Sequence, residues 1–236
     1  MSGTRGTTTR RRAPLTRDRV LRRAVEIADE HGVDALTMRR LADDLGVEAM
    51  SLYHHVRGKD GILDGAVEVV LDEIEEAVGL LGPPDAADGG GAAGWRVAVR
   101  DRALAARTVM LRHPWAPAVM EARNVMTLSA ARHVDGVVGL MRAGGLSWDL
   151  VHHGLHALGS RLYGFTQELG EPAGGDAEAE ALLAGLAPQI PNLVAMLSAV
   201  AHDEPGSTLG WCDDQTEFEF GLDLLLDGLE RLAQDG

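Results

Sequence analysis

A cluster of basic, hydroxyl and imidazole side chains lies within residues 37–59 of this 236-residue chain. Its members are Thr37, Arg39, Arg40, Ser51, Tyr53, His54, His55 and Lys59. Such groups hydrogen-bond to phosphate oxygens and to the edges of bases, so they are suited to binding a nucleic acid. Ala49 and Met50 lie in the same segment, and their apolar side chains suit contact with thymine methyl groups.

A second group of side chains has the spacing of a metal site. His152 and His156 are four residues apart, with Asp149 near the same helical face, and this arrangement can chelate a divalent cation. The sequence places no third or fourth ligand, however, and histidines on a helix are more often simply hydrogen-bonded. We therefore expect no metal and no cofactor.

Nothing in the sequence favours catalysis. The motifs Gly-x-Ser-x-Gly, His-Glu-x-x-His, Walker A and Gly-x-Gly-x-x-Gly are all absent. The single cysteine, Cys212, lies beside acidic residues, which disfavour the reactive thiolate. The chain is therefore predicted not to be an enzyme.

Charge is distributed unevenly along the chain, whose formal net charge is −14. Residues 1–60 carry 12 basic and 9 acidic side chains, whereas residues 61–236 carry 10 basic and 27 acidic ones. This asymmetry indicates a polyanion-binding end and an acidic body. The alternative is an Arg-rich tail, with Arg10, Arg11 and Arg12, on an ordinary acidic protein.

The pattern of apolar residues is helical throughout and predicts an all-α fold of nine or ten helices. No apolar run approaches the roughly 18 residues that a membrane span needs. The first residues are basic but are followed by no apolar segment of a secretory signal. We therefore expect a cytoplasmic protein with no membrane partner.

Residues 41–56, LADDLGVEAMSLYHHV, have the pattern of a helix-turn-helix. Ala42 is the small residue where the helices cross, Gly46 forms the turn, and the locking residues are apolar. The two helices are predicted at about 38–45 and 49–55, after a first helix that begins at Thr16 and ends near Gly32. The alternative is a generic pair of short helices in an all-α core.

The segment 36–74, LTMRRLADDLGVEAMSLYHHVRGKDGILDGAVEVVLDEI, resembles the DNA-binding domain of the tetracycline-repressor family. Weaker similarity to the body of the tetracycline-repressor subgroup extends over most of residues 15–234. The resemblance implies an all-α homodimer that reads a palindromic DNA operator with its N-terminal domains and binds a small-molecule effector in its body. The implied organisation is a flexible basic arm at 1–13, a helix-turn-helix domain at 14–60 and a ligand-binding and dimerisation domain at 61–236.

The resemblance also assigns roles to the basic cluster. Arg39 is the candidate for reading a guanine, whereas Tyr53, His54, His55 and Lys59 fall where the family contacts phosphates. For Tyr53 the alternative is packing against the first helix. The arm can add phosphate or minor-groove contacts, or remain a solvated tail.

Two helices, expected near 147–169 and 214–234, each carry an apolar stripe beside a strip of small residues. A pair of such helices from each of two chains would make a four-helix bundle, with Gly154 and Gly228 at the close crossings. The alternative is that both helices complete the core of a monomer. We expect the dimer, because one helix-turn-helix makes few contacts for a specific operator reader.

An effector pocket in the body is expected to be mostly apolar. The candidate lining residues are His113, Trp115, Met120, Asn124, Met126, His152, Tyr163, Phe165 and Met196, each of which could equally be core. Met120 falls where the tetracycline repressor has its metal-binding histidine, so the effector is predicted to bind without magnesium. The rival functions are an enzyme or carrier that keeps a DNA-binding-like start, and a DNA-binding activator or architectural protein without a ligand.

Overall fold

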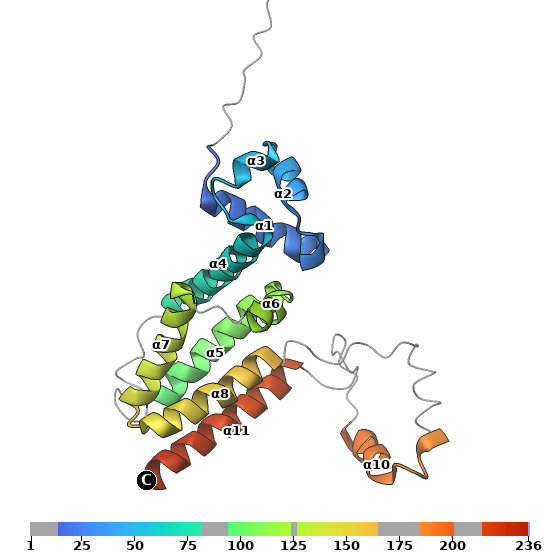
Figure 1. The fold of residues 1–236 in the computed structure, drawn as a ribbon. Helices are drawn as coiled ribbons and strands as arrows, with labels where there is room; N and C mark the ends of the chain where they lie inside the picture. The colour runs from blue at the N-terminus through green and yellow to red at the C-terminus, as the bar shows by residue number, and fades with distance from the viewer. Residues whose placement is uncertain (1–13, 82–93, 124–126, 165–184, 201–213, 236) are drawn as a thin grey trace, which may run out of the picture.

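The computed structural model describes residues 14–81, 94–123, 127–164, 185–200 and 214–235 (Figure 1). Within these ranges the chain forms ten α-helices and one short 3₁₀ helix, and no strand, which confirms the predicted all-α class. The elements are α1 (Arg17–His31), η1 (Val33–Ala35), α2 (Met38–Leu45), α3 (Ala49–Leu52), α4 (Gly58–Leu80), α5 (Gly94–Arg112), α6 (Ala116–Arg123), α7 (Leu128–Ala143), α8 (Trp148–Gly164), α10 (Pro191–Val200) and α11 (Asp214–Asp235). The predicted basic arm lies outside the described residues.

Local sequence signals fix the start of the fold. The hydroxyl of Thr16 accepts a hydrogen bond from the backbone N–H of Arg19 and caps α1, while Thr37 caps α2 through the N–H of Arg40. Gly46 ends α2 in the left-handed conformation, at φ 65°, which a glycine adopts without steric cost. Helices α1 to α3 therefore form a small group packed on the first turns of α4 (Figure 1).

Helix α4 is shared by both parts of the molecule. It packs against α1 at one end and against α5, α6 and α7 along the rest of its length. One continuous buried core includes Ile27 of α1, Ile62 and Ile74 of α4, and Met110 of α5. Helix α4 is therefore packed into both the N-terminal group and the body.

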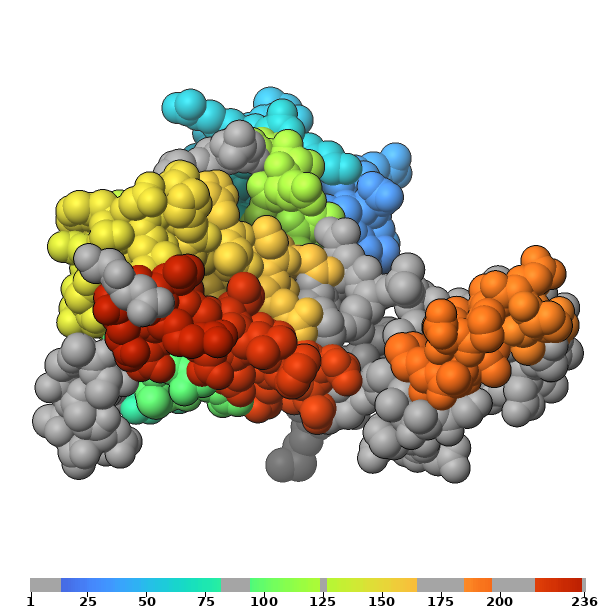
Figure 2. Space-filling model, turned by 90° about the horizontal axis from the view of Figure 1, so that it is seen from below, coloured from blue at the N-terminus to red at the C-terminus, as the bar shows by residue number. Residues whose placement is uncertain are grey.

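Helices α8 and α11 lie side by side and close one face of the body (Figure 2). The side chains of Phe218, Leu222, Leu226 and Leu229 are buried and complete the core. Gly154 faces inward as well, since a Cβ there would overlap the Met141 side chain. The prediction that Gly154 lies at a crossing between two chains is therefore wrong: its missing side chain makes room for packing within one chain.

Helix α10 stands apart from the bundle in Figure 1. No described helix of the chain is long and apolar enough to cross a membrane.

Candidate DNA interface and ligand cavity

The helix-turn-helix is held together by the apolar residues that the motif predicts. Leu41, Ala42, Leu45 and Leu52 are all buried between the helices. With their apolar faces turned inward, α2 and α3 present their remaining side chains to the surface. The structure thus builds the local geometry of a DNA-reading motif.

Most of the predicted DNA-binding residues lie on this exposed side. The Arg39 side chain is 92% exposed and reaches 4.0 Å from Asp43, while Met50 is 72% exposed. Tyr53 is 52% exposed and therefore does not belong to the buried core, which argues against the packing alternative. Lys59 is exposed at the start of α4.

The remaining candidates differ in accessibility. Thr37, which caps α2, and His54 are exposed, whereas Arg40, Ala49, Ser51 and His55 are partly buried. A hollow of about 380 Å³ lies beside this surface. It is lined by Arg17, Tyr53, His54, His55, Val56, Arg57, Gly61 and Asp64.

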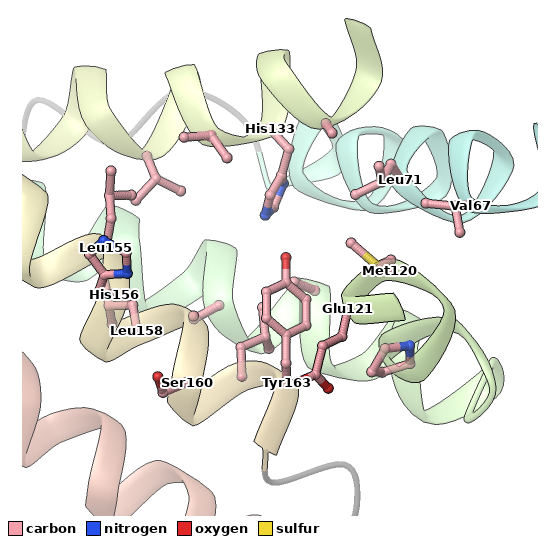
Figure 3. A pocket seen from close by; sticks show the side chains of 18 of the residues that line it. Val67, Leu71, Met120, Glu121, His133, Leu155, His156, Leu158, Ser160 and Tyr163 are labelled. Carbon is pink, nitrogen blue, oxygen red and sulfur yellow. The ribbon is translucent and has the colours of Figure 1, made fainter. Parts of the chain in front are cut away.

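The body contains a cavity of about 1010 Å³ (Figure 3). Its walls come from α4, α5, α6, α7 and α8, and most of the lining is apolar. Val67 and Leu71 of α4 face Met120 of α6 across it, and Tyr163 rises from α8 (Figure 3). A cavity of this size and character suits a small organic molecule.

One part of the cavity wall is polar. The Arg102 guanidinium forms an ion pair with Glu75, and the carboxylate Oε1 of Glu75 also lies 2.9 Å from Nδ1 of His133. Burial opposes ionisation of Glu75, but the hydrogen bonds from Arg102 and His133 outweigh it and lower the pKa of this carboxyl. Burial also lowers the pKa of His133, against the opposing effect of Glu75, and it raises the pKa of Tyr163.

Three of the nine predicted pocket residues line the cavity: Met120, His152 and Tyr163. Met196 lies on α10, where it is 50% exposed. Asn124, Met126 and Phe165 lie outside the described residues.

His113 and Trp115 do not line this cavity and are buried elsewhere, as in the alternative that they belong to the core. His113 is 6% exposed, with Nδ1 2.9 Å from Asp29 of α1 and Nε2 3.2 Å from Glu73 of α4. The indole N–H of Trp115 donates to the same Asp29 carboxylate at 2.6 Å. These two side chains join the corner between α5 and α6 to the N-terminal helices.

Arg102, His133 and Glu75 were missed by the sequence analysis. They come from three helices and share no local spacing, so no motif connects them. The only available signal was the occurrence of an arginine and a histidine on otherwise apolar helix faces, where a buried charge needs a partner.

The paired histidines of α8 lie close together, with the ring centroids of His152 and His156 4.7 Å apart. Both rings are exposed and both line the cavity. Across the part of the chain that the structure describes, no group of three or more His, Cys, Asp or Glu side chains could hold a metal ion.

A helix-turn-helix joined by one continuous helix to a hollow helical body is the architecture of a ligand-responsive, DNA-binding regulator. Residues 20–66 match the family of bacterial regulatory proteins named tetR, and residues 88–233 match the tetracyclin repressor-like C-terminal domain. The second match alone covers more than half of the chain.

Individual relatives agree with these matches. The transcriptional repressor DrrR1 of Streptomyces coeruleorubidus is 35% identical over 231 residues, which cover 93% of this chain and 78% of that protein. The class D tetracycline repressor of Escherichia coli is 33% identical over 102 residues, 43% of this chain and 42% of that one. The crystal structure of apo ActR from Streptomyces coelicolor has a TM-score of 0.73 at 28% identity, over 94% of this chain and 98% of that one.

The chain therefore belongs to the tetR family of bacterial regulatory proteins, and it is a helix-turn-helix transcriptional repressor of the ligand-responsive class. Regulators of this family are generally not enzymes.

Proposed function

We propose that this repressor binds a palindromic operator as a homodimer in the cytoplasm and is released by a small, mostly apolar effector that needs no magnesium. The domain at 14–60 contacts DNA, and residues 61–236 hold the effector and the dimer interface. The observation that carries the proposal is the exposed helix-turn-helix connected to the cavity through α4.

The DNA-binding surface is supported by the exposure of its side chains. Arg39 and Met50 are free of the core and extend from the helix-turn-helix, where they can reach base edges in the major groove. Lys59, at the first turn of α4, carries a point charge suited to a phosphate. Arg39 is thus assigned to reading sequence and Lys59 to positioning.

The homodimer is supported by an apolar stripe on α11 that no described part of the chain covers. Phe220, Leu224 and Leu232 are 62%, 54% and 59% exposed, and their spacing of four and eight residues places them on one helical face. Gly228 falls in the same stripe, and a Cβ there would meet nothing within 4 Å. A second copy of α11 can therefore approach this face closely, and α8 beside it would complete a four-helix bundle.

The effector site is supported by the cavity and by a structural relative. ActR, which is 29% identical over 94% of this chain with a TM-score of 0.70, has been solved in complex with actinorhodin. The cavity of this chain is lined chiefly by apolar side chains such as Val67, Leu71 and Met120. An aromatic, polyketide-like effector would bind it mainly through burial of apolar area.

Mobility-shift assays with promoter fragments that flank the gene test this proposal. We expect binding by a dimer that weakens steeply with salt, because each neutralised phosphate contributes about −0.9 to the log–log slope. Polyketide-like compounds should then release the DNA equally well with and without a chelator. Salt-insensitive binding, or release that disappears with the chelator, would contradict the proposal.

A further inference from the structure

His133 of α7 is buried at the polar part of the cavity, yet one of its ring nitrogens has no partner among the described residues. The residue is 7% exposed and its Nδ1 lies 2.9 Å from the Glu75 carboxylate. Its Nε2 has no hydrogen bond to any residue that the structure describes. The ring points into the cavity, toward the hydroxyl of Tyr163 (Figure 3).

The neighbours of His133 decide which nitrogen carries the proton. The ion pair with Arg102 keeps the Glu75 carboxyl group ionised. An ionised carboxylate only accepts hydrogen bonds, so Nδ1 of His133 must carry the proton that it donates to Glu75. The Arg102 Nη2 also approaches Nδ1, but at 3.4 Å, well beyond the 2.9 Å contact with Glu75. Burial favours the neutral ring. The neutral ring with its proton on Nδ1 leaves a lone pair on Nε2, directed at the cavity.

We propose that the effector carries a neutral phenolic hydroxyl that donates a hydrogen bond to Nε2 of His133. This inference rests on the proposed function, because it concerns the effector of the same cavity. The Tyr163 hydroxyl lies beside the site (Figure 3). The rings of the effector would then lie against Val67, Leu71 and Met120.

The same arrangement disfavours a carboxylate as the partner of Nε2. A carboxylate has no proton to donate, so its oxygens would face the lone pair of Nε2. The group recognised at this nitrogen is therefore a neutral phenol.

The experiment compares phenols with their own methyl ethers, which keep the skeleton and remove only the donor. The probe pairs are 2-naphthol with 2-methoxynaphthalene and estrone with estrone methyl ether, each titrated calorimetrically into the full-length protein without DNA. We expect each phenol to bind about tenfold more tightly than its ether, as for one hydrogen bond formed in a buried site.

Variants assign the preference to one nitrogen. His133→Phe keeps an aromatic ring and leaves Glu75 paired with Arg102, and it should bring the phenol-to-ether ratio close to one. His153→Phe changes a histidine of α8 that is 68% exposed and lies outside the cavity lining, and it should leave the ratio unchanged.

The outcomes separate the two proposals. Equal affinity of phenol and ether in the unaltered protein, or an undiminished preference in His133→Phe, would overturn the role of Nε2 while leaving the cavity as the effector site. If none of the four probes bound at all, the phenol assignment would be overturned. If the phenols bound with the expected preference but failed to release operator DNA, the proposed effector response would be wrong, and the recognition chemistry would stand.

Discussion

Asp29 connects the DNA-binding helices to the body through two buried donors, so its removal has a calculable cost. Its carboxylate lies 2.9 Å from Nδ1 of His113 and 2.6 Å from the indole nitrogen of Trp115. Each buried donor left without an acceptor costs about 1–3 kcal/mol. The Asp29 side chain is 28% exposed, so water can enter and offset part of this loss. Asp29→Ala should therefore lower the free energy of unfolding by about 2–4 kcal/mol.

Thermal unfolding followed by circular dichroism at fixed protein concentration measures this effect. In a chain of this size the loss corresponds to a fall in Tm of about 5–12 °C. Glu30→Ala is the matched control, because the neighbouring Glu30 side chain is 55% exposed and makes only surface ion pairs. Its effect should stay within about 0.5 kcal/mol. Equal Tm values for the two variants would refute the argument that Asp29 holds the α5–α6 corner.

Three further predictions concern DNA, assembly and pH. Lys59→Ala should weaken binding to operator and random DNA alike and lower the salt slope by about one per half-site. Arg39→Ala should instead relax specificity at one position of each half-site. Mobility shifts at several salt concentrations measure both effects, and the reverse pattern would exchange the roles of the two residues. Phe220→Glu combined with Leu224→Glu should yield monomers in sedimentation, and an intact dimer would place the interface elsewhere. Folding lowers the pKa of His133 below its ordinary value of 6.5, so as the pH falls the unfolded chain takes up this proton before the folded chain does. The contribution of neutral His133 to the free energy of unfolding is therefore present above pH 6.5 and is lost as the pH falls below 6.5. His133→Phe should flatten this loss in thermal melts, and an equal pH slope in variant and parent would contradict it.

The sequence predicted the helix-turn-helix closely because its determinants are local. Thr16 and Thr37 each cap the helix that follows, by accepting a hydrogen bond from the backbone N–H three residues later. Gly46 is needed where the backbone adopts the left-handed conformation. These signals act within one or two turns of the chain. They can be read without knowing the packing of any other helix.

The cavity could be predicted only in part, because its polar wall depends on packing between distant segments. Glu75, Arg102 and His133 meet across separations of 27 to 58 residues. A histidine in an apolar segment looks the same in the sequence whether it faces a cavity or a carboxylate, so the sequence did not show that His113 lies outside the cavity. For Gly154, a strip of small residues does not indicate whether the approaching group belongs to the same chain or to a second one.

The continuity of α4 has a consequence for how the repressor would behave in a cell. Val67 and Leu71 of this helix line the cavity, and Lys59 lies in its first turn at the DNA-binding surface. If the effector lowers operator affinity through this helix, operator DNA must lower effector affinity by the same factor. Free repressor would then take up effector at lower concentrations than repressor already seated on a promoter. The induction threshold would therefore depend on the ratio of dimers to operator copies, and surplus repressor would buffer the effector before transcription begins.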